Sequence, residues 1–375
     1  MNFYSIYSGG GGAGDWGGVN RVWLEYMKPV LKQRVLLKFG DVFLEHASGK
    51  NFYRPRRWEE ITDLRQWLFK CTSDAYVLKQ SDILLDSGTA KAVSWINTQK
   101  KCSSCKALIE NFKFYFDKYR VLDKYVDIVV KSNINSAVTF DIPNPFKIRT
   151  DSDNKKLNIL NSSASTQLVK VSADYANTIY SMLKKRNATD NVLMPIINGM
   201  WSEEEIYIFL SSLNFTPKKI AIGGLSSIRS KKELETCIQT LKKYDTSNYM
   251  QVHYLGCGGL SKVEVLKKNG IDSTNISVDC STPINRSIDG NLAGTAKSGY
   301  FQYDSKKLIR IEPGTVEQIL EIHKNVKNAY YTEAEMEDIL YWVLKHQSHQ
   351  SSDRTYEARA KLIFHNYDVH RRFAD

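Results

Sequence analysis

Eight short runs of apolar and β-branched residues recur along the chain, and they constrain its fold more than any other feature. Several are apolar at nearly every position, which is typical of strands buried on both faces. The segments between the later runs have the pattern of helices, so strand and helix alternate. The runs are FYSIYS (3–8), RVLLKF (34–39), DILLDS (82–87), VTFDIP (138–143), VLMPII (192–197), KIAIGG (219–224), QVHYLG (251–256) and ISVDCS (276–281).

This alternation predicts an α/β fold with a parallel sheet. Eight candidate strands favour a closed (β/α)8 barrel of TIM type, and a doubly wound open sheet is the alternative. We expect the barrel to span 1–312 with an insertion at about 40–80, and 313–375 to form a C-terminal helical region packed on it. Capping spacing marks four helix starts, at Ser202/Glu205, Ser230/Glu233, Thr315/Gln318 and Thr332/Glu335.

The chain of 375 residues carries a formal net charge of +11. Such an excess favours a polyanionic partner, with nucleic acid first and an acidic membrane surface second, although a basic but indifferent surface gives the same total. The segment KNFYRPRRW (50–58) interleaves Lys50, Arg54, Arg56 and Arg57 with three aromatic rings. That mixture suits contact with a nucleic-acid backbone and stacked bases, and an ordinary basic loop is the alternative.

Targeting and redox signals point to the cytoplasm. The N-terminal segment lacks the basic and apolar regions of a signal peptide, and no run of about 18 apolar residues predicts a membrane span. The 6 cysteines are scattered through a long chain, which is typical of a reducing compartment rather than of a secreted disulfide framework.

Polar residues and glycines stand where the predicted strands end. In a parallel barrel these ends face one rim, where catalytic residues gather. Carboxylates there can act as nucleophile, acid or base, and glycines let a flat ligand approach the backbone. Any one of these aspartates has an ordinary alternative role as a helix cap. The strand ends supply Asp86, Asp141, Asn198, Gly223, Gly224, Gly256 and Asp279.

Taken in order, these motifs resemble the tRNA-guanine transglycosylase superfamily. The resemblance covers roughly 82–290 and rests on DILLDSG, VTFDI, PIINGM, IAIGGLS, VHYLGCG and VDCSTPINR, of which AIGGLS and the last are the most specific. The chain looks closer to the DNA-guanine transglycosylase branch, which places 7-deazaguanines in phage and bacterial DNA. The opening strand FYSIYS and the aspartate-containing ending of the last strand are similar to that branch.

The resemblance implies a double displacement. Asp279 would attack C1′ of a guanosine nucleotide and expel guanine, and a 7-deazaguanine base would then replace the enzyme with net retention. Asp86 would transfer the protons that the leaving and entering bases need. The base-binding set would be Asp141, Asn198, Ser87, Gly223, Gly224 and Gly256, and Arg286 would join the basic residues of 50–57 in binding nucleic acid. No cofactor is implied.

The chain departs from the tRNA-type enzymes in two places. Thr89-Ala90-Lys91 follows Asp86-Ser87-Gly88 where those enzymes have an aromatic residue and a glutamine, and their zinc motif of three cysteines and a histidine is absent after Cys280. Zinc is therefore not expected, and DNA is favoured over tRNA as the polymer.

Two readings from other classes stay open. One is a nucleic-acid-binding barrel without catalysis, and the other is an unrelated barrel enzyme acting on a small sugar or phosphate. The non-catalytic hypothesis does not explain why Asp86, Asp141 and Asp279 are all present, and the small-substrate hypothesis does not explain the positive net charge. The transglycosylase resemblance implies a cytoplasmic protein of a bacterial host, encoded by the bacterium or by a phage, and leaves a homodimer open.

Overall fold

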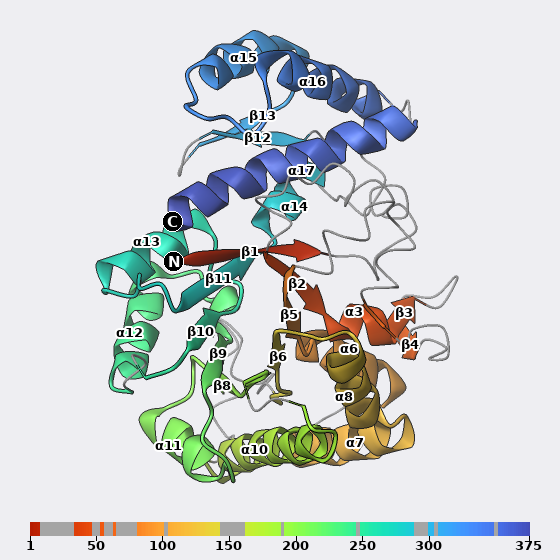
Figure 1. The fold of residues 1–375 in the computed structure, drawn as a ribbon, viewed down its shortest axis with the longest axis vertical. Helices are drawn as coiled ribbons and strands as arrows, with labels where there is room; N and C mark the ends of the chain where they lie inside the picture. The colour runs from red at the N-terminus through yellow and green to blue at the C-terminus, as the bar shows by residue number, and fades with distance from the viewer. Residues whose placement is uncertain are drawn as a thin grey trace.

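The computed structural model describes residues 1–7, 34–46, 53–55, 63–64, 81–100, 104–142, 162–188, 191–244, 248–288, 299–303, 307–348 and 352–375. A parallel sheet of nine strands forms its centre (Figure 1). The strands are β1 (Asn2–Tyr7), β2 (Arg34–Lys38), β5 (Asp82–Asp86), β6 (Ser136–Val138), β7 (Leu193–Met194), β8 (Ile196–Asn198), β9 (Lys219–Gly223), β10 (Gln251–Tyr254) and β11 (Ile276–Cys280).

The sheet curves almost full circle. Its order is β7-β6-β5-β2-β1-β11-β10-β9-β8, so the first and last strands of the row are the two segments on either side of Pro195. β7 pairs with β6, whereas β8 pairs with β9. Proline has no N–H for a strand ladder, and here its carbonyl accepts a bond from Ala221 N at 3.0 Å. The predicted α/β class and a barrel-like parallel sheet are therefore confirmed.

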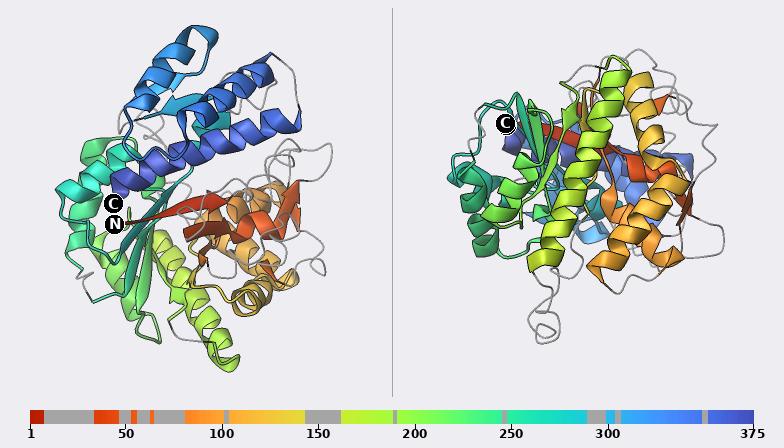
Figure 2. Two further views of the ribbon diagram at one scale, coloured as in Figure 1. Left: turned by 45° about the horizontal axis from the view of Figure 1, so that its top comes forward. Right: turned by 90° about the horizontal axis from the view of Figure 1, so that it is seen from below.

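Helices surround this sheet, as the two views in Figure 2 show. Their apolar faces pack on strands whose central positions are buried, which gives one continuous core. A short antiparallel hairpin of β3 (Leu44–His46) and β4 (Tyr53–Pro55) lies within the predicted insertion. The helices are α3 (Phe39–Phe43), α6 (Thr89–Gln99), α7 (Cys105–Lys118), α8 (Val121–Lys131), α10 (Ser162–Lys185), α11 (Glu203–Ser211), α12 (Lys231–Lys242), α13 (Leu260–Lys268) and α14 (Thr282–Ile288).

The chain beyond α14 adds a hairpin and three helices. The hairpin joins β12 (Tyr300–Gln302) and β13 (Leu308–Arg310), and the helices are α15 (Val316–Lys324), α16 (Glu333–Gln347) and α17 (Asp353–Ala374). α17 returns to the barrel and lies along β1 (Figure 1). The Tyr367 hydroxyl of α17 donates there to the carbonyl of Ile6 at 3.0 Å. The helical character predicted from 313 onward is thus observed, and the domain boundary itself stays a prediction.

The structure confirms most of the predicted helix starts but not every predicted strand end. The capping boxes at Ser202 and Thr332 are both present, and Ser230 caps α12. The predicted helix start at Thr315 is confirmed, because Thr315 is the N-cap residue of α15. Its side chain makes no capping bond to that helix, and its hydroxyl donates instead to the carbonyl of Arg310 at 2.7 Å. The predicted strand 138–143 is shifted: β6 ends at Val138, so Asp141 follows the strand instead of ending it.

Candidate active site

Asp279 lies near the carboxyl end of β11, with only 3% of its surface exposed. One carboxylate oxygen, Oδ1, accepts hydrogen bonds from His253 Nε2 at 3.0 Å and from the backbone N–H of Gly256 at 2.8 Å. The described part of the chain offers no hydrogen bond to the other oxygen, Oδ2. Neither donor belongs to α14, so Asp279 is held by the neighbouring strand and does not cap the next helix.

His253 projects from β10 into the barrel and is fully buried. Its second ring nitrogen, Nδ1, lies 2.9 Å from the hydroxyl oxygen of Ser277, and the ring of Tyr4 meets it edge-on with centroids 5.4 Å apart. Because a carboxylate oxygen only accepts, Nε2 must carry the hydrogen of the bond to Asp279. Three neighbouring parallel strands, β1, β10 and β11, therefore fix this imidazole beside the carboxylate.

Asp86 ends β5 and carries a carboxyl group with a raised pKa. Burial is the main cause, and the charge of Asp279 adds to it. Lys38 on β2, the Gly88 N–H at 3.3 Å and His253 act in the opposite direction. Asp279 is thus close enough to Asp86 for its charge to affect the pKa of Asp86. The raised pKa lets the carboxyl group of Asp86 keep a proton at a higher pH than an ordinary aspartate does.

Asp141 is a second buried carboxyl group beside Asp86. Burial raises its pKa to about 6, and the charge of Asp86 contributes, while its own backbone N–H and the Thr89 hydroxyl favour the ionised form. Thr89 in turn shares a hydrogen bond of 2.9 Å with the buried hydroxyl of Ser87. The structure therefore brings together Asp86, Ser87 and Asp141, as the sequence predicted.

Asn198 and the glycines of β9 and β10 continue the same rim. Asn198 pairs with Gly223 in the β8–β9 register and uses its side-chain oxygen to accept from Met200 N at 3.1 Å. Gly224 has a φ of +79°, and a Cβ there would lie 2.3 Å from the Asn198 oxygen. Only glycine therefore permits this close approach. The Gly256 N–H is already used by Asp279, so this residue helps to hold the carboxylate, which the sequence did not predict.

The predicted nucleic-acid contacts are described only in part. Arg54 is exposed on β4, in the hairpin that follows the carboxyl end of β2, and pairs in register with Glu45 of β3. The backbone of Arg286 lies in α14, and its side chain falls outside the described structure. Lys50, Arg56 and Arg57 also lie outside the described residues.

Sequence reasoning missed the polar interior of the barrel. Tyr4 donates to Asp82 Oδ2 at 2.5 Å and accepts from Gln251 Nε2 at 3.2 Å, inside a sheet for which the sequence predicted several strands that are apolar at nearly every position. The signal was a polar residue at every second position of QVHY and ISVDC. Alternate side chains of a strand point to the same face, so Gln251, His253, Ser277 and Asp279 all face inward.

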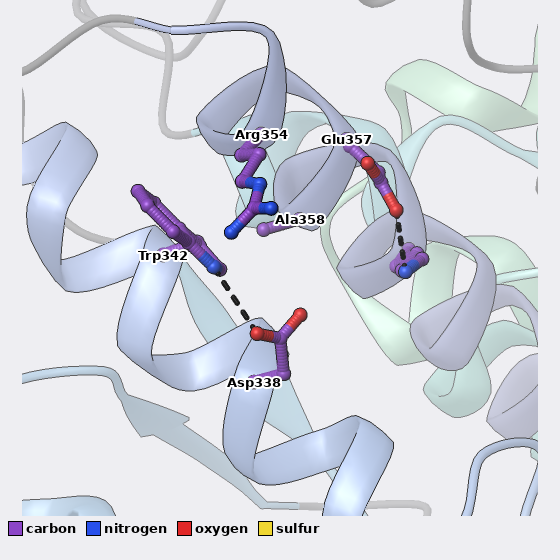
Figure 3. Close-up of a pocket in the computed structure, with 6 residues that line it drawn as sticks. Asp338, Trp342, Arg354, Glu357 and Ala358 are labelled. Carbon is purple, nitrogen blue, oxygen red and sulfur yellow. Dashed lines mark hydrogen bonds and ion pairs between the residues drawn. The ribbon is translucent and has the colours of Figure 1, made fainter.

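A second candidate location is a cavity of about 330 Å³ between α16 and α17 (Figure 3). The Arg354 guanidinium lies over the Trp342 ring, 5.4 Å from its centroid, and the indole N–H donates to Asp338 at 3.1 Å. Glu357 pairs with Lys361 at 2.6 Å. The charged groups of this cavity already contact one another. The barrel rim combines two carboxyl groups of raised pKa with a carboxylate oxygen, Asp279 Oδ2, that accepts no hydrogen bond from the described residues. The rim is the stronger candidate.

The described residues contain no group of three or more His, Cys, Asp or Glu side chains that could hold a metal ion. None of the described helices is long and apolar enough to cross a membrane. Comparison of the chain with protein-family models and with curated proteins finds no match.

Proposed function

We propose that this chain is a guanine transglycosylase that exchanges guanine in DNA for a 7-deazaguanine base. Its scaffold would be a (β/α)8 barrel of TIM type, in which β7 and β8 count as one strand interrupted at Pro195. The observation that carries the proposal is the state of Asp279, whose Oδ1 is held by two donors while Oδ2 accepts no bond from the described residues.

The first displacement is a reaction of Asp279 at C1′ of the target nucleotide. Oδ2 forms a bond to C1′ as the bond from C1′ to guanine N9 breaks, and the electron pair leaves with guanine. Asp86 donates a proton to that base, a role supported by its raised pKa. The enzyme is then joined to the DNA by an ester, as in retaining glycosidases.

The second displacement reverses these steps with a different base. N9 of the 7-deazaguanine attacks C1′, its proton passes to Asp86, and the ester bond to Asp279 breaks. No electron acceptor or cofactor is needed, because one C–N bond and one N–H bond are exchanged for another pair of the same kinds. Two inversions at C1′ give net retention.

Base recognition is assigned to the rest of the rim. Asp141 would accept from N1–H and the 2-amino group of guanine when it is ionised, and Asn198 would donate its unused amide hydrogens. Ser87, Gly223, Gly224 and Gly256 would contact the base through their backbone groups. The target base has to leave the helical stack to reach this rim.

The net charge of +11 supports a polyanionic substrate. Phosphate contacts are assigned to Lys50, Arg54, Arg56, Arg57 and Arg286. Such an enzyme would work without a membrane, in the cytoplasm of a bacterial host.

The test uses the purified protein with 7-cyano-7-deazaguanine and either a guanine-containing DNA duplex or a matched tRNA. Each polymer is digested to nucleosides, and the deazaguanine nucleoside is measured by mass spectrometry. We expect modified DNA, and we expect Asp279→Asn to reduce the exchange by about 1,000-fold or more, as for removal of a covalent nucleophile. Asp272→Asn is the control, because this aspartate is exposed and lies before β11.

Modification of tRNA alone would move the assignment to the tRNA enzyme. If neither polymer is modified and Asp279→Asn behaves like Asp272→Asn, the transglycosylase proposal is wrong and a non-catalytic barrel becomes the better reading.

A further inference from the structure

A continuous line of hydrogen bonds crosses the inside of the barrel and ends on the candidate nucleophile. It begins at the amino ends of the strands, where Lys219 Nζ donates to Ser136 Oγ at 2.9 Å. Ser136 Oγ donates to Gln251 Oε1 at 3.0 Å, and Gln251 Nε2 donates to Ser277 Oγ at 3.0 Å. In full, the hydrogen-bonded line connects, in this order, Lys219, Ser136, Gln251, Ser277, His253 and Asp279.

The donor and acceptor roles in this line are compatible, because a hydroxyl that accepts one bond can donate the next. Ser277 accepts from Gln251, which leaves its own hydroxyl hydrogen free to donate to His253 Nδ1. An imidazole that accepts at Nδ1 carries its hydrogen on Nε2, the atom that faces Asp279. Ser136, Gln251, Ser277 and His253 have no buried side-chain nitrogen or oxygen without a partner, and such buried networks fix side chains in one orientation.

We propose that His253 is a positioning residue for Asp279, an inference that rests on the proposed function and deepens it. His253 and the Gly256 N–H both donate to Oδ1, so the carboxylate cannot rotate without losing two bonds. This restraint leaves Oδ2, which accepts no bond from the described residues, as the attacking atom. Orientation of a reacting group in this way is a large source of rate enhancement.

The same two donors also favour the second displacement over the first. Before attack, Oδ1 shares a full negative charge, and in the ester it becomes a neutral carbonyl oxygen. Hydrogen bonds to a charged acceptor are stronger than those to a neutral one. His253 therefore stabilises the aspartate as it leaves C1′, and its loss slows breakdown of the covalent intermediate more than formation.

Two nearly isosteric substitutions test this role. His253→Gln places an amide N–H near the position of Nε2, whereas His253→Met has the same length and no donor. Formation of the enzyme–DNA adduct is followed on denaturing gels without the incoming base, and its breakdown is followed after 7-cyano-7-deazaguanine is added. We expect His253→Met to slow breakdown by about 10- to 100-fold, as for loss of a preorganised donor, and to accumulate adduct. His253→Gln should recover most of the rate.

Three results separate the possible failures. If both variants slow formation and breakdown equally while the wild type is active, His253 has only a structural role and the inference is wrong. If the wild type forms no adduct, the proposed function fails, and the positioning role in that reaction fails with it. The contact itself is read independently by ¹⁵N-histidine NMR. The Nε2–H resonance of His253 should shift in Asp279→Asn and stay fixed in Asp272→Asn, and an unmoved resonance overturns the contact.

Discussion

Burial gives the carboxyl groups at the barrel rim unusual proton affinities. Asp141 and Asp86 both have pKa values raised mainly by burial; the charge of Asp86 adds to the shift of Asp141, and the charge of Asp279 adds to the shift of Asp86. A buried carboxylate is costly to ionise, so the fold carries an energetic penalty at neutral pH in order to keep these groups at the rim. Such a penalty is typical of functional positions, where activity and stability compete.

This penalty is measurable at Asp141. Its pKa is about 6 in the folded state and 3.8 as the model-peptide value. Between these values the folded protein binds a proton that the unfolded chain has released, so the free energy of unfolding falls as the pH rises through this window. We expect Asp141→Asn to remove this fall and to raise the free energy of unfolding at pH 7.5 by about 1–3 kcal/mol.

Urea unfolding of the wild type and of Asp141→Asn between pH 4 and pH 8 measures the difference. The two curves should be closest near pH 4, where Asp141 is protonated in the folded protein and about half protonated in the unfolded chain. Parallel curves over the whole range would mean that Asp141 ionises as freely in the barrel as in the unfolded chain. Asp272→Asn again supplies the exposed control.

The turn after β10 shows how one loop element holds the carboxylate. Gly256 has a φ of +67°, which points its N–H at Asp279 Oδ1. Two residues later, the N–H of Gly258 donates to the backbone carbonyl of Asp279 at 2.7 Å. The backbone of this turn therefore lies directly on β11. The N–H groups of Gly256 and Gly258 thus both bond to Asp279, a contact that the sequence did not predict.

Gly258 and Gly259 provide a matched pair for testing this turn. A Cβ at Gly258 would lie 2.8 Å from the carbonyl carbon of Asp279 and 2.7 Å from the ring of Phe3, whereas nothing lies within 4 Å of a Cβ at Gly259. We expect Gly258→Ala to lower the free energy of unfolding by about 1–3 kcal/mol through overpacking. Its exchange activity should also fall, because Asp279 is displaced.

The neighbouring Gly259→Ala should change the free energy of unfolding by less than about 1 kcal/mol, the usual size of an N-cap effect. Thermal unfolding and the nucleoside assay compare the two variants directly. Equal behaviour of the two would show that the turn relaxes away from β11 without cost.

At the scale of the whole molecule, α17 connects the C-terminal elements to the barrel. His370 Nδ1 lies 2.8 Å from the carbonyl of Gly258, and the Asn366 amide oxygen accepts from Gln302 N at 3.0 Å. His365 stacks on Phe301 with centroids 4.5 Å apart. The helix thus contacts both the turn that holds Asp279 and the hairpin that precedes α15, so its docking affects the site as well as stability.

The two buried histidines make this docking sensitive to acid. Burial lowers the pKa of His365 and of His370 to about 4. Below pH 6.5 the unfolded chain binds protons that the folded protein does not, so the free energy of unfolding falls as the pH drops from 6.5 toward 4. At pH 5 each histidine should account for about 2 kcal/mol of this loss.

His370→Asn isolates one of the two histidines, because the asparagine amide can still donate to the Gly258 carbonyl and does not titrate. Urea unfolding from pH 7 to pH 4.5 should show about half of the histidine-dependent loss in this variant. An unchanged acid dependence would mean that His370 is accessible to protons in the folded protein. Combination with Asp141→Asn removes the opposing contribution of that carboxyl group.

The strand runs were predictable because burial on both faces leaves a strong local pattern. Their order, the helices between them and the meeting of Asp86, Asp141, Asn198 and Asp279 at one rim follow from parallel strands. The end of β6 was misplaced, since VTFDIP is apolar beyond the last ladder residue. The apolar pattern indicates which residues are buried, and Phe140 and Ile142 are buried although the strand ladder of β6 ends before them.

What the sequence determined by itself is therefore the local alternation of strand and helix, most helix starts and the set of carboxylates available to a rim. The tertiary structure alone decided the closure of the sheet between β1 and β11, the docking of α17 and the partners of Asp279. His253 and Asp279 are 26 positions apart, and Tyr4 and Gln251 are 247 apart. Hydrogen bonds over such separations leave no local pattern, because their geometry exists only after the barrel has formed.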